Sequence, residues 1–260
     1  LATAGLERGD RFGYLSKNSA DYLIMYYAAS KAGVVPVPLN YRLAPPEWAY
    51  ILNDSQSSLL ITSAEYQEDI NEIRGGLETV SQYIAIDGNN NLEWQDYRQW
   101  VADQPSTPPD RRILTGDDLN QMYTSGTTGH PKGAVVTHST VCANIYQTSM
   151  GVGLNANERC LIVTPLYHVA GGFVSFLAIS MGGSVYIQED FIPEEVVSAL
   201  SEERICLIIL VPSMIQACLV AVPDIAERSY PYLQTMLYAA SPIAEQTLRR
   251  AMDVFKCEFS

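Results

Sequence analysis

Short apolar runs alternate with longer helical patterns along most of the chain. The apolar runs are rich in β-branched residues and end at turn-forming residues, which is typical of buried strands. The predicted strands cover residues 11–15, 34–39, 59–62, 82–86, 159–164, 184–187, 206–211 and 233–238. The predicted helices lie at residues 20–32, from 45, 64–77, 139–150, 171–181, from 193, from 212 and 244–255. This alternation favours an α/β fold with mostly parallel sheets.

Several element ends carry their own signals. Asn18-Ser19 can cap the helix 20–32 at its start, and Gly33 suits the position just after its end. Pro45 suits the start of the next helix, because the missing N–H costs little there. Pro36 and Pro38 place the strand 34–39 at a sheet edge or give it an irregular end.

The most distinctive stretch runs from residue 122 to residue 138. Glycine lets a backbone approach an anion closely, and backbone N–H groups together with hydroxyls donate hydrogen bonds to phosphate oxygens. Lys132 adds a positive charge. The stretch therefore predicts a phosphate-binding loop, whose glycines and hydroxyl residues are Thr124, Ser125, Gly126, Thr127, Thr128, Gly129 and Gly133.

This loop differs from the P-loop of kinases and NTPases. A P-loop places Ser or Thr after its lysine and opens into a helix. Here Pro131 precedes Lys132, Gly133 follows it, and residues 134–137 form a β-branched run. We therefore expect a hairpin between two strands, which makes kinase-type chemistry a distant alternative.

Composition narrows the function further. The 260-residue chain has 16 Lys+Arg against 29 Asp+Glu, a net charge of −13. This acidic balance argues against binding to nucleic acid or to anionic membranes. The five cysteines show no Cys-x-x-Cys spacing, so we expect free thiols in a reducing compartment, the cytoplasm. No apolar run is long enough to span a bilayer, and no signal peptide is evident.

Residues 123–133, Tyr-Thr-Ser-Gly-Thr-Thr-Gly-His-Pro-Lys-Gly, resemble the signature loop of the acyl-adenylate-forming, or AMP-binding, enzymes. Residues 165–172 and 237–243 resemble two further segments of that family. The resemblance implies two stacked α/β subdomains with the active site between them. Residues 1–155 would form the first subdomain, with the phosphate-binding loop, and residues 156–260 part of the second. Both ends of the chain look cut, so we expect a fragment of the family's N-terminal domain.

The resemblance also implies a reaction, in which a carboxylate attacks the α-phosphate of ATP to give an acyl-adenylate and pyrophosphate. The loop residues Thr124 to Gly129 and Lys132 would hold the phosphates. Thr128 would help to bind Mg²⁺. His168 would orient the carboxylate, so that His168 and Lys132 are the predicted catalytic residues. The adenine would lie against Ala239, Ala240, Ser241 and Pro242.

The surroundings of His168 bear on the substrate. Family members that activate amino acids usually carry an aspartate here, because a buried ammonium needs such a partner. Val169, Ala170 and Phe173 surround His168 in sequence, with no acid nearby. We therefore expect an uncharged aliphatic or aromatic acid, as in fatty acid metabolism. Phe173, Val174 and Leu177 are pocket walls or plain core, with no preference between the two.

Tyr238 departs from the family pattern, in which a small residue is common. It would shorten an acyl tunnel if it pointed there, and it would have no bearing on the substrate if it pointed into the core.

Three functions stay open from the sequence. The resemblance favours an acyl-CoA synthetase, an acid–thiol ligase that uses ATP, Mg²⁺ and CoA. An enzyme that loads the acyl group onto a carrier protein is the nearest alternative. A non-catalytic nucleotide-binding module is the third. Family motifs that carry further catalytic residues are not found in this sequence, so we expect the 260-residue chain alone to be nearly inactive.

Overall fold

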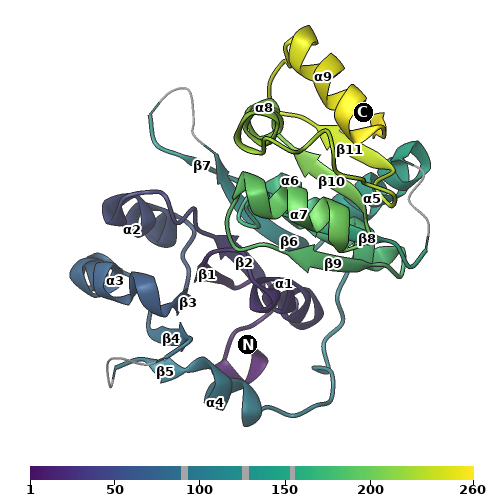
Figure 1. The fold of residues 1–260 in the computed structure, drawn as a ribbon. Coiled ribbons are helices and arrows are strands. Elements are labelled where there is room, and N and C mark those ends of the chain that lie inside the picture. The colour runs from purple at the N-terminus through teal and green to yellow at the C-terminus, as the bar shows by residue number, and fades with distance from the viewer. Residues whose placement is uncertain (89–92, 125–128, 153–155) are drawn as a thin grey trace. The chain divides into compact units, whose positions relative to one another are not determined.

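The computed structural model describes residues 1–88, 93–124, 129–152 and 156–260. It divides into two compact units, Leu1–Cys142 and Ala143–Ser260 (Figure 1). Each unit is built around its own parallel sheet, which confirms the predicted α/β class. The predicted division after residue 155 stays a prediction, because residues 153–155 lie outside the described residues.

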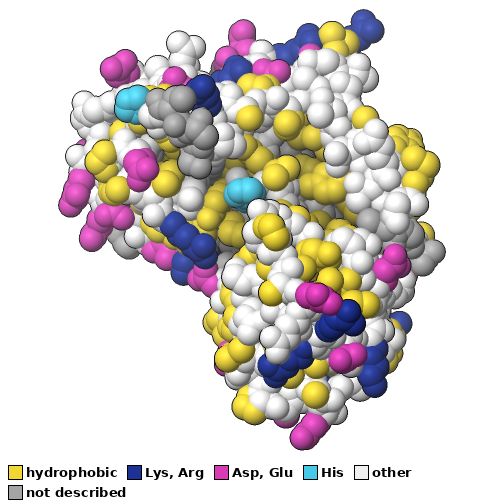
Figure 2. All heavy atoms as spheres, turned by 90° about the horizontal axis from the view of Figure 1, so that it is seen from above, with side chains coloured by type: hydrophobic (Ala, Val, Ile, Leu, Met, Phe, Trp, Pro, Cys, Tyr) yellow, Lys and Arg dark blue, Asp and Glu magenta, His cyan; other side chains and the backbone are white. Residues whose placement is uncertain are grey.

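The surface carries interspersed charges. On the face shown in Figure 2, lysine and arginine side chains lie scattered among acidic ones and do not gather into a basic patch. Of the five cysteines, all are free; Cys160, Cys206 and Cys218 are buried, as expected for thiols in apolar runs. Within the described ranges, no helix is both long and apolar enough to cross a bilayer.

The sheet of the first unit has the strand order β2-β1-β3-β4-β5, and all of these neighbours are parallel. The strands are β1 (Arg11–Leu15), β2 (Val35–Pro38), β3 (Leu59–Ser63), β4 (Gln82–Ile86) and β5 (Gln95–Asp96). β2 is an edge strand of this sheet, as its two prolines predict, because proline has no N–H to donate to a neighbour.

Helices α1 (Ala20–Ala32), α2 (Pro45–Asp54) and α3 (Gln67–Ile73) connect the first four of these strands, and α4 (Tyr97–Ala102) follows β5. The first of them is capped as predicted: the Ser19 hydroxyl accepts from Tyr22 N, and Gly33 has φ 67° at its end. Trp48, Ile51 and Leu52 of α2 are buried in one cluster with the sheet and with Ile70 of α3.

The predicted helix 64–77 is interrupted. A 3₁₀ turn, Ala64–Tyr66, precedes α3, and a second, Arg74–Gly76, follows it. Two consecutive glycines, Gly75 and Gly76, explain the early end, because glycine is a poor helix former. The sequence pattern also missed β5 and α4. Their residues are largely exposed, and α4 is only one and a half turns long, with Asp96 accepting from Gln99 N at its start.

Beside the sheet lies an antiparallel hairpin of β6 (Asp118–Thr124) and β7 (Lys132–Thr137), with β6 next to β2. This confirms the predicted hairpin. Arg11 of β1 ties β6 to the sheet, because its guanidinium donates to Gln121 Oε1 at 2.7 Å and to Asp118 Oδ2 at 3.0 Å. Helix α5 (His138–Val152) follows directly.

The sheet of the second unit is parallel throughout, in the order β12-β11-β10-β8-β9. Its strands are β8 (Arg159–Ile162), β9 (Ser184–Ile187), β10 (Ile205–Leu210), β11 (Thr235–Tyr238) and β12 (Glu258–Phe259). The chain leaves β8 toward β9 on one side and returns to β10 on the other. The strand order therefore reverses between β8 and β10, and such a switch point opens a crevice at the carboxyl ends of the strands.

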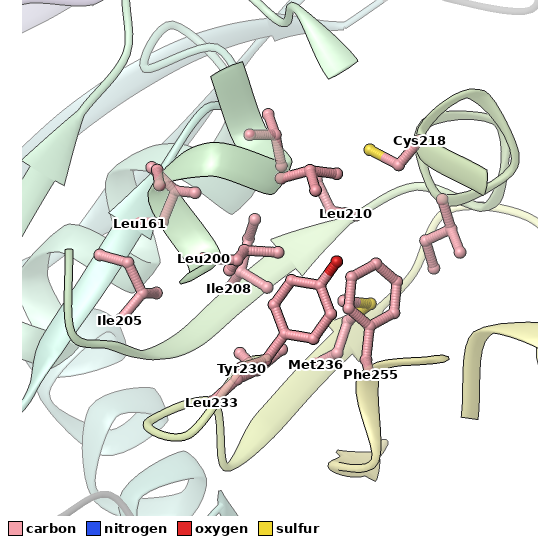
Figure 3. Packing of buried hydrophobic residues seen from close by; sticks show 14 of the residues in the cluster. Leu161, Leu200, Ile205, Ile208, Leu210, Cys218, Tyr230, Leu233, Met236 and Phe255 are labelled. Carbon is pink, nitrogen blue, oxygen red and sulfur yellow. The ribbon is translucent and has the colours of Figure 1, made fainter. Parts of the chain in front are cut away.

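Helices α6 (Val169–Ser180), α7 (Pro193–Glu202), α8 (Pro212–Ala221) and α9 (Glu245–Phe255) cover this sheet. The last three share one buried cluster with β10 and β11 (Figure 3). In that cluster the rings of Tyr230 and Phe255 pack at 5.0 Å between centroids, and Tyr230 donates to Ile225 O. Right-handed crossovers put α6 on the opposite face.

The N-cap of α1 gives a first test. Replacing Ser19 by alanine removes the acceptor for Tyr22 N, so Ser19→Ala should lower the free energy of unfolding by about 1 kcal/mol. Urea denaturation measures this. Ser30→Ala, within the same helix, is the matched control and should be close to neutral. Equal effects of the two substitutions would show that the cap contributes nothing.

Candidate functional site

The hairpin brings two of the predicted phosphate-binding residues together. Thr124 ends β6 and Lys132 begins β7, and the two are paired directly across the hairpin. Both are exposed. Gly129 has φ 128°, a backbone conformation that only glycine adopts without strain. The other predicted loop residues, Ser125, Gly126, Thr127 and Thr128, lie outside the described residues.

Lys132 keeps its charge available. Among the described residues its ammonium forms no ion pair, whereas other basic residues of this unit, such as Arg8, Arg11 and Arg74, are paired with carboxylates. An exposed cation on a glycine-rich turn is suited to an anionic ligand when, as in the described part of this chain, no carboxylate is paired with it.

Gly133 is required for packing and not for its dihedral angles. A Cβ at this position would lie 2.4 Å from Gln121 Nε2 and 3.0 Å from Tyr123 Cζ. Both side chains belong to β6 and lie across Gly133, and Gln121 Nε2 donates to Tyr123 Oη at 3.2 Å. Glycine therefore lets these side chains lie across the strand that carries Lys132.

His168 stands at the start of α6, as its N-cap residue, and is exposed. The strand before it ends at Ile162, two residues earlier than predicted, and the helix begins at Val169, also two residues earlier than predicted. Gly171 allows the helix to begin so close to the strand, because a Cβ there would lie 2.6 Å from Thr164 O and 2.7 Å from Pro165 O.

The neighbours of His168 on α6 differ in burial. Val174 and Leu177 are buried, with 1% and 0% of their surface exposed, whereas Phe173 is half-buried. Val174 and Leu177 are thus part of the packed core in this structure. Phe173 is better placed to meet a substrate, and its role in a pocket stays a prediction.

Residues Ala239, Ala240, Ser241 and Pro242 follow β11 and are exposed. Ala240 has φ 74°, so the backbone turns sharply there. Tyr238 packs against the buried cluster of the second unit, which favours a structural role over a place in an acyl tunnel. Because β8 and β11 are parallel strands of one sheet, His168 and these four residues follow strand ends at the same edge.

Sequence reasoning missed the contacts that α2 makes with the hairpin. Asp54 accepts a hydrogen bond from the Tyr123 hydroxyl, and the Tyr50 ring stacks on His130. These residues lie about 70 to 80 positions from the hairpin in sequence. Their only sequence signal is the four-residue spacing of Tyr50 and Asp54, which puts them on one helix face.

The fold places the chain among α/β proteins with parallel sheets and a strand-order reversal. Over residues 1–260 it matches the family model described as AMP-binding enzyme, and the chain belongs to that family. This confirms the resemblance seen in the signature loop.

Within the aligned region, several named relatives are about one-third identical to the chain. Feruloyl-CoA synthase from Amycolatopsis sp is 34% identical over 254 residues, 97% of this chain and 48% of the relative. Long-chain-fatty-acid–CoA ligase FadD13 from Mycobacterium tuberculosis is 32% identical over 96% of this chain and 48% of its own length. Fatty acid–[acyl-carrier-protein] ligase ScoC from Streptomyces coeruleorubidus is 30% identical over 100% of this chain and 49% of its own length. The chain spans about half the length of these relatives.

A solved structure agrees with the fold. The inhibitor-bound N-terminal domain of FACL13 from Mycobacterium tuberculosis superposes with a TM-score of 0.90 at 30% identity, over 99% of this chain and 63% of that one. The predicted similarity to the N-terminal domain of acyl-CoA synthetases is therefore confirmed at the level of fold.

The packing at Gly133 predicts the effect of adding one methyl group. Gly133→Ala should displace Tyr123 and Gln121 and lower the free energy of unfolding by about 1–3 kcal/mol. Gly116→Ala is the matched control, since a Cβ there meets nothing within 4 Å. Urea denaturation of both variants tests this. An unchanged free energy of unfolding in Gly133→Ala would contradict the close packing around Gly133.

His138 predicts a pH dependence. Burial lowers the pKa of His138, against an opposing effect of Asp117, and its Nε2 has no hydrogen-bond partner among the described residues. A neutral His138 therefore stabilises the fold above the ordinary histidine pKa of about 6.5, and this contribution is lost as pH falls below it. His138→Gln should lessen the decline in unfolding free energy between about pH 7 and pH 5. An unchanged decline would contradict this.

Proposed function

We propose that the protein containing this chain activates a carboxylic acid with ATP and then forms an acyl-CoA thioester. In the first step a carboxylate oxygen attacks the α-phosphorus, the bond to the leaving β-phosphate oxygen breaks, and pyrophosphate departs. The observation that carries this proposal is an exposed Lys132 that stands opposite Thr124 on a glycine-rich hairpin and forms no ion pair with any described residue, in a chain of the AMP-binding enzyme family.

The work of such a site is to align two anions and to offset their repulsion. Lys132 would contribute its charge to the ATP phosphates, and the hydroxyl of Thr124 and the backbone around Gly129 would donate hydrogen bonds. A Cβ at Gly129 would meet no atom of the described residues within 4 Å, which fits the close approach of a phosphate. Ser125, Gly126, Thr127 and Thr128 complete the proposed loop.

Mg²⁺ would neutralise charge on the phosphates, with Thr128 as its proposed protein ligand. Among the residues that the structure describes, no group of three or more His, Cys, Asp or Glu side chains is placed to hold a metal. One hydroxyl together with phosphate oxygens and water is ordinary Mg²⁺ ligation, so the residues present fit a metal that arrives with the nucleotide.

On the second unit, His168 would orient the carboxylate of the acid, and no proton transfer is needed because a carboxylate is already a nucleophile. Ala239, Ala240, Ser241 and Pro242 would flank the adenine. Their small side chains and their position after β11 leave main chain exposed for a flat ring.

The substrate we propose is an uncharged aliphatic or aromatic acid. The segment around His168 offers Val169, Ala170 and Phe173 and no carboxylate that could pair with an ammonium. Three of the relatives point the same way, since their names specify feruloyl, long-chain fatty acid and indoleacetate groups, whereas another is named for crotonobetaine and carnitine, which carry a quaternary ammonium. A role in fatty acid metabolism is one form of this proposal.

For the acceptor we favour CoA, and a carrier protein is the alternative that the name of ScoC supports. We place the reaction in the cytoplasm, because the five cysteines are free and three of them are buried. We propose no nucleic-acid partner, given the net charge of −13.

Carboxylate-dependent exchange between ATP and pyrophosphate tests this function. With the full-length gene product and a panel of aliphatic and aromatic acids, one acid class should support exchange. Lys132→Ala should lower kcat/KM for ATP by about a hundredfold, since an interaction with phosphate charge is removed. Lys31→Ala, at an exposed lysine of α1, is the control and should leave exchange unchanged.

Two outcomes would count against the proposal. Absence of exchange with every acid would favour a non-catalytic nucleotide-binding module. An unchanged kcat/KM for ATP in the Lys132→Ala enzyme would show that the hairpin lysine is not part of the site. The 260-residue chain alone should show almost no exchange, and robust turnover by it would overturn that expectation.

A further inference from the structure

Helix α2 touches both arms of the hairpin that carries Lys132. Tyr50 and Asp54 stand four residues apart on this helix, so their side chains project from the same face. Asp54 contacts the incoming arm, through Tyr123, and Tyr50 contacts the outgoing arm, through His130 and Pro131. One helix face thus holds the chain immediately before Thr124 and immediately before Lys132.

On the incoming arm the contact is a hydrogen bond to a carboxylate. Tyr123 Oη donates to Asp54 Oδ2 at 2.5 Å and accepts from Gln121 Nε2 at 3.2 Å. Burial and the neighbouring Asp54 raise the pKa of Tyr123 far above its ordinary value, so the hydroxyl keeps its proton and remains a donor. Hydrogen bonds to a charged acceptor are among the stronger ones in proteins.

This hydrogen bond extends back into the sheet. Arg11 of β1 donates to Gln121 Oε1, which completes a line of side chains from the sheet through β6 to α2. Such a line fixes the direction of Tyr123, and with it the backbone that leads to Thr124, from two sides.

On the outgoing arm the contact is a ring stack with one hydrogen bond. The rings of Tyr50 and His130 lie 4.7 Å apart between centroids and 21° from parallel. Tyr50 Oη donates to Pro131 O at 3.3 Å. Pro131 is the residue before Lys132, so this bond holds the main chain where β7 begins.

Helix α2 is itself well anchored. Trp48, Ile51 and Leu52 are almost completely buried, and Trp48 Nε1 donates to Asn40 O at 2.9 Å. At its start, Glu47 accepts from Ala44 N. A helix held by its core face and its N-terminus is a rigid support for the two side chains on its outer face.

We infer that Tyr50 and Asp54 are positioning residues for the phosphate-binding hairpin. They hold the two arms so that Thr124 and Lys132 face a bound polyphosphate together, which lowers the cost of ordering the site when ATP binds. This inference rests on the proposed function, and it adds residues that touch neither the acid nor the nucleotide.

The test separates positioning from mere stability. In the full-length gene product, Tyr50→Ala, Asp54→Ala and Tyr123→Phe should each raise KM for ATP about tenfold in the exchange assay. KM for the acid should stay within about twofold, because the acid-orienting residue His168 is not on this unit. Tyr50→Phe keeps the ring stack and should recover most of the loss seen in Tyr50→Ala.

A double-mutant cycle tests the hydrogen bond itself. Asp54→Ala and Tyr123→Phe remove the two ends of one interaction, so the double variant should be no worse than the more impaired single variant. Tyr41→Ala is the matched control: it lies at the margin of the same buried cluster and stacks on Tyr66, away from the hairpin. It should lower the thermal midpoint without raising KM for ATP.

The outcomes are distinguishable. Absence of exchange with every acid in the wild-type protein would overturn the proposed function. It would not contradict the packing of α2 against the hairpin. Active wild-type protein, with variants whose KM for ATP is unchanged, overturns the positioning role. Equal rises in KM for ATP in Tyr41→Ala and Tyr50→Ala would show a general effect of lost stability, and would overturn it as well.

Discussion

The pairing of β6 with β7 is the interaction on which the proposed chemistry depends. It sets Thr124 opposite Lys132 and leaves the lysine without a carboxylate partner among the described residues. A P-loop presents its lysine from the start of a helix, whereas here the lysine is the first residue of a strand. Its position is therefore fixed by cross-strand hydrogen bonds and by the side chains that lie against the strand.

The acidic character of the chain makes this local arrangement more important. A net charge of −13 repels an anionic nucleotide, so attraction must come from groups within a few ångströms. An ammonium with no ion pair among the described residues, N–H groups at a glycine-rich turn and a metal bound to the nucleotide can supply it. In the positioning role that we infer for Tyr50 and Asp54, the contacts from α2 hold the arms of that turn before the nucleotide arrives.

The local features of the fold could be predicted from sequence. The hairpin followed from Pro131 and Gly133 around Lys132, and the N-cap of α1 followed from Ser19, because each signal lies within a few residues of its effect. The early end of α3 was missed although Gly75 and Gly76 marked it, because the apolar pattern continued past them. β5 and α4 left too little apolar pattern to detect.

In the candidate site, too, local features could be predicted and remote contacts could not. Lys132, Thr124 and His168 were predicted as site residues because they stand in contiguous motifs. Tyr50 and Asp54 were not, because their partners Tyr123, His130 and Pro131 lie far away in sequence, and a tyrosine on a half-buried helix gives no sign of what it touches. Contacts between remote segments require coordinates.

In the proposed reaction a carboxylate attacks the α-phosphorus of ATP, and the path of the oxygen atoms reports on this step. The full-length protein is given ATP, CoA and an acid with ¹⁸O in its carboxylate, and the products are examined by mass spectrometry. We expect one ¹⁸O atom in AMP, carried over when the thioester forms. Label in inorganic phosphate, or ADP as the nucleotide product, would show attack at the γ-phosphorus and would contradict it.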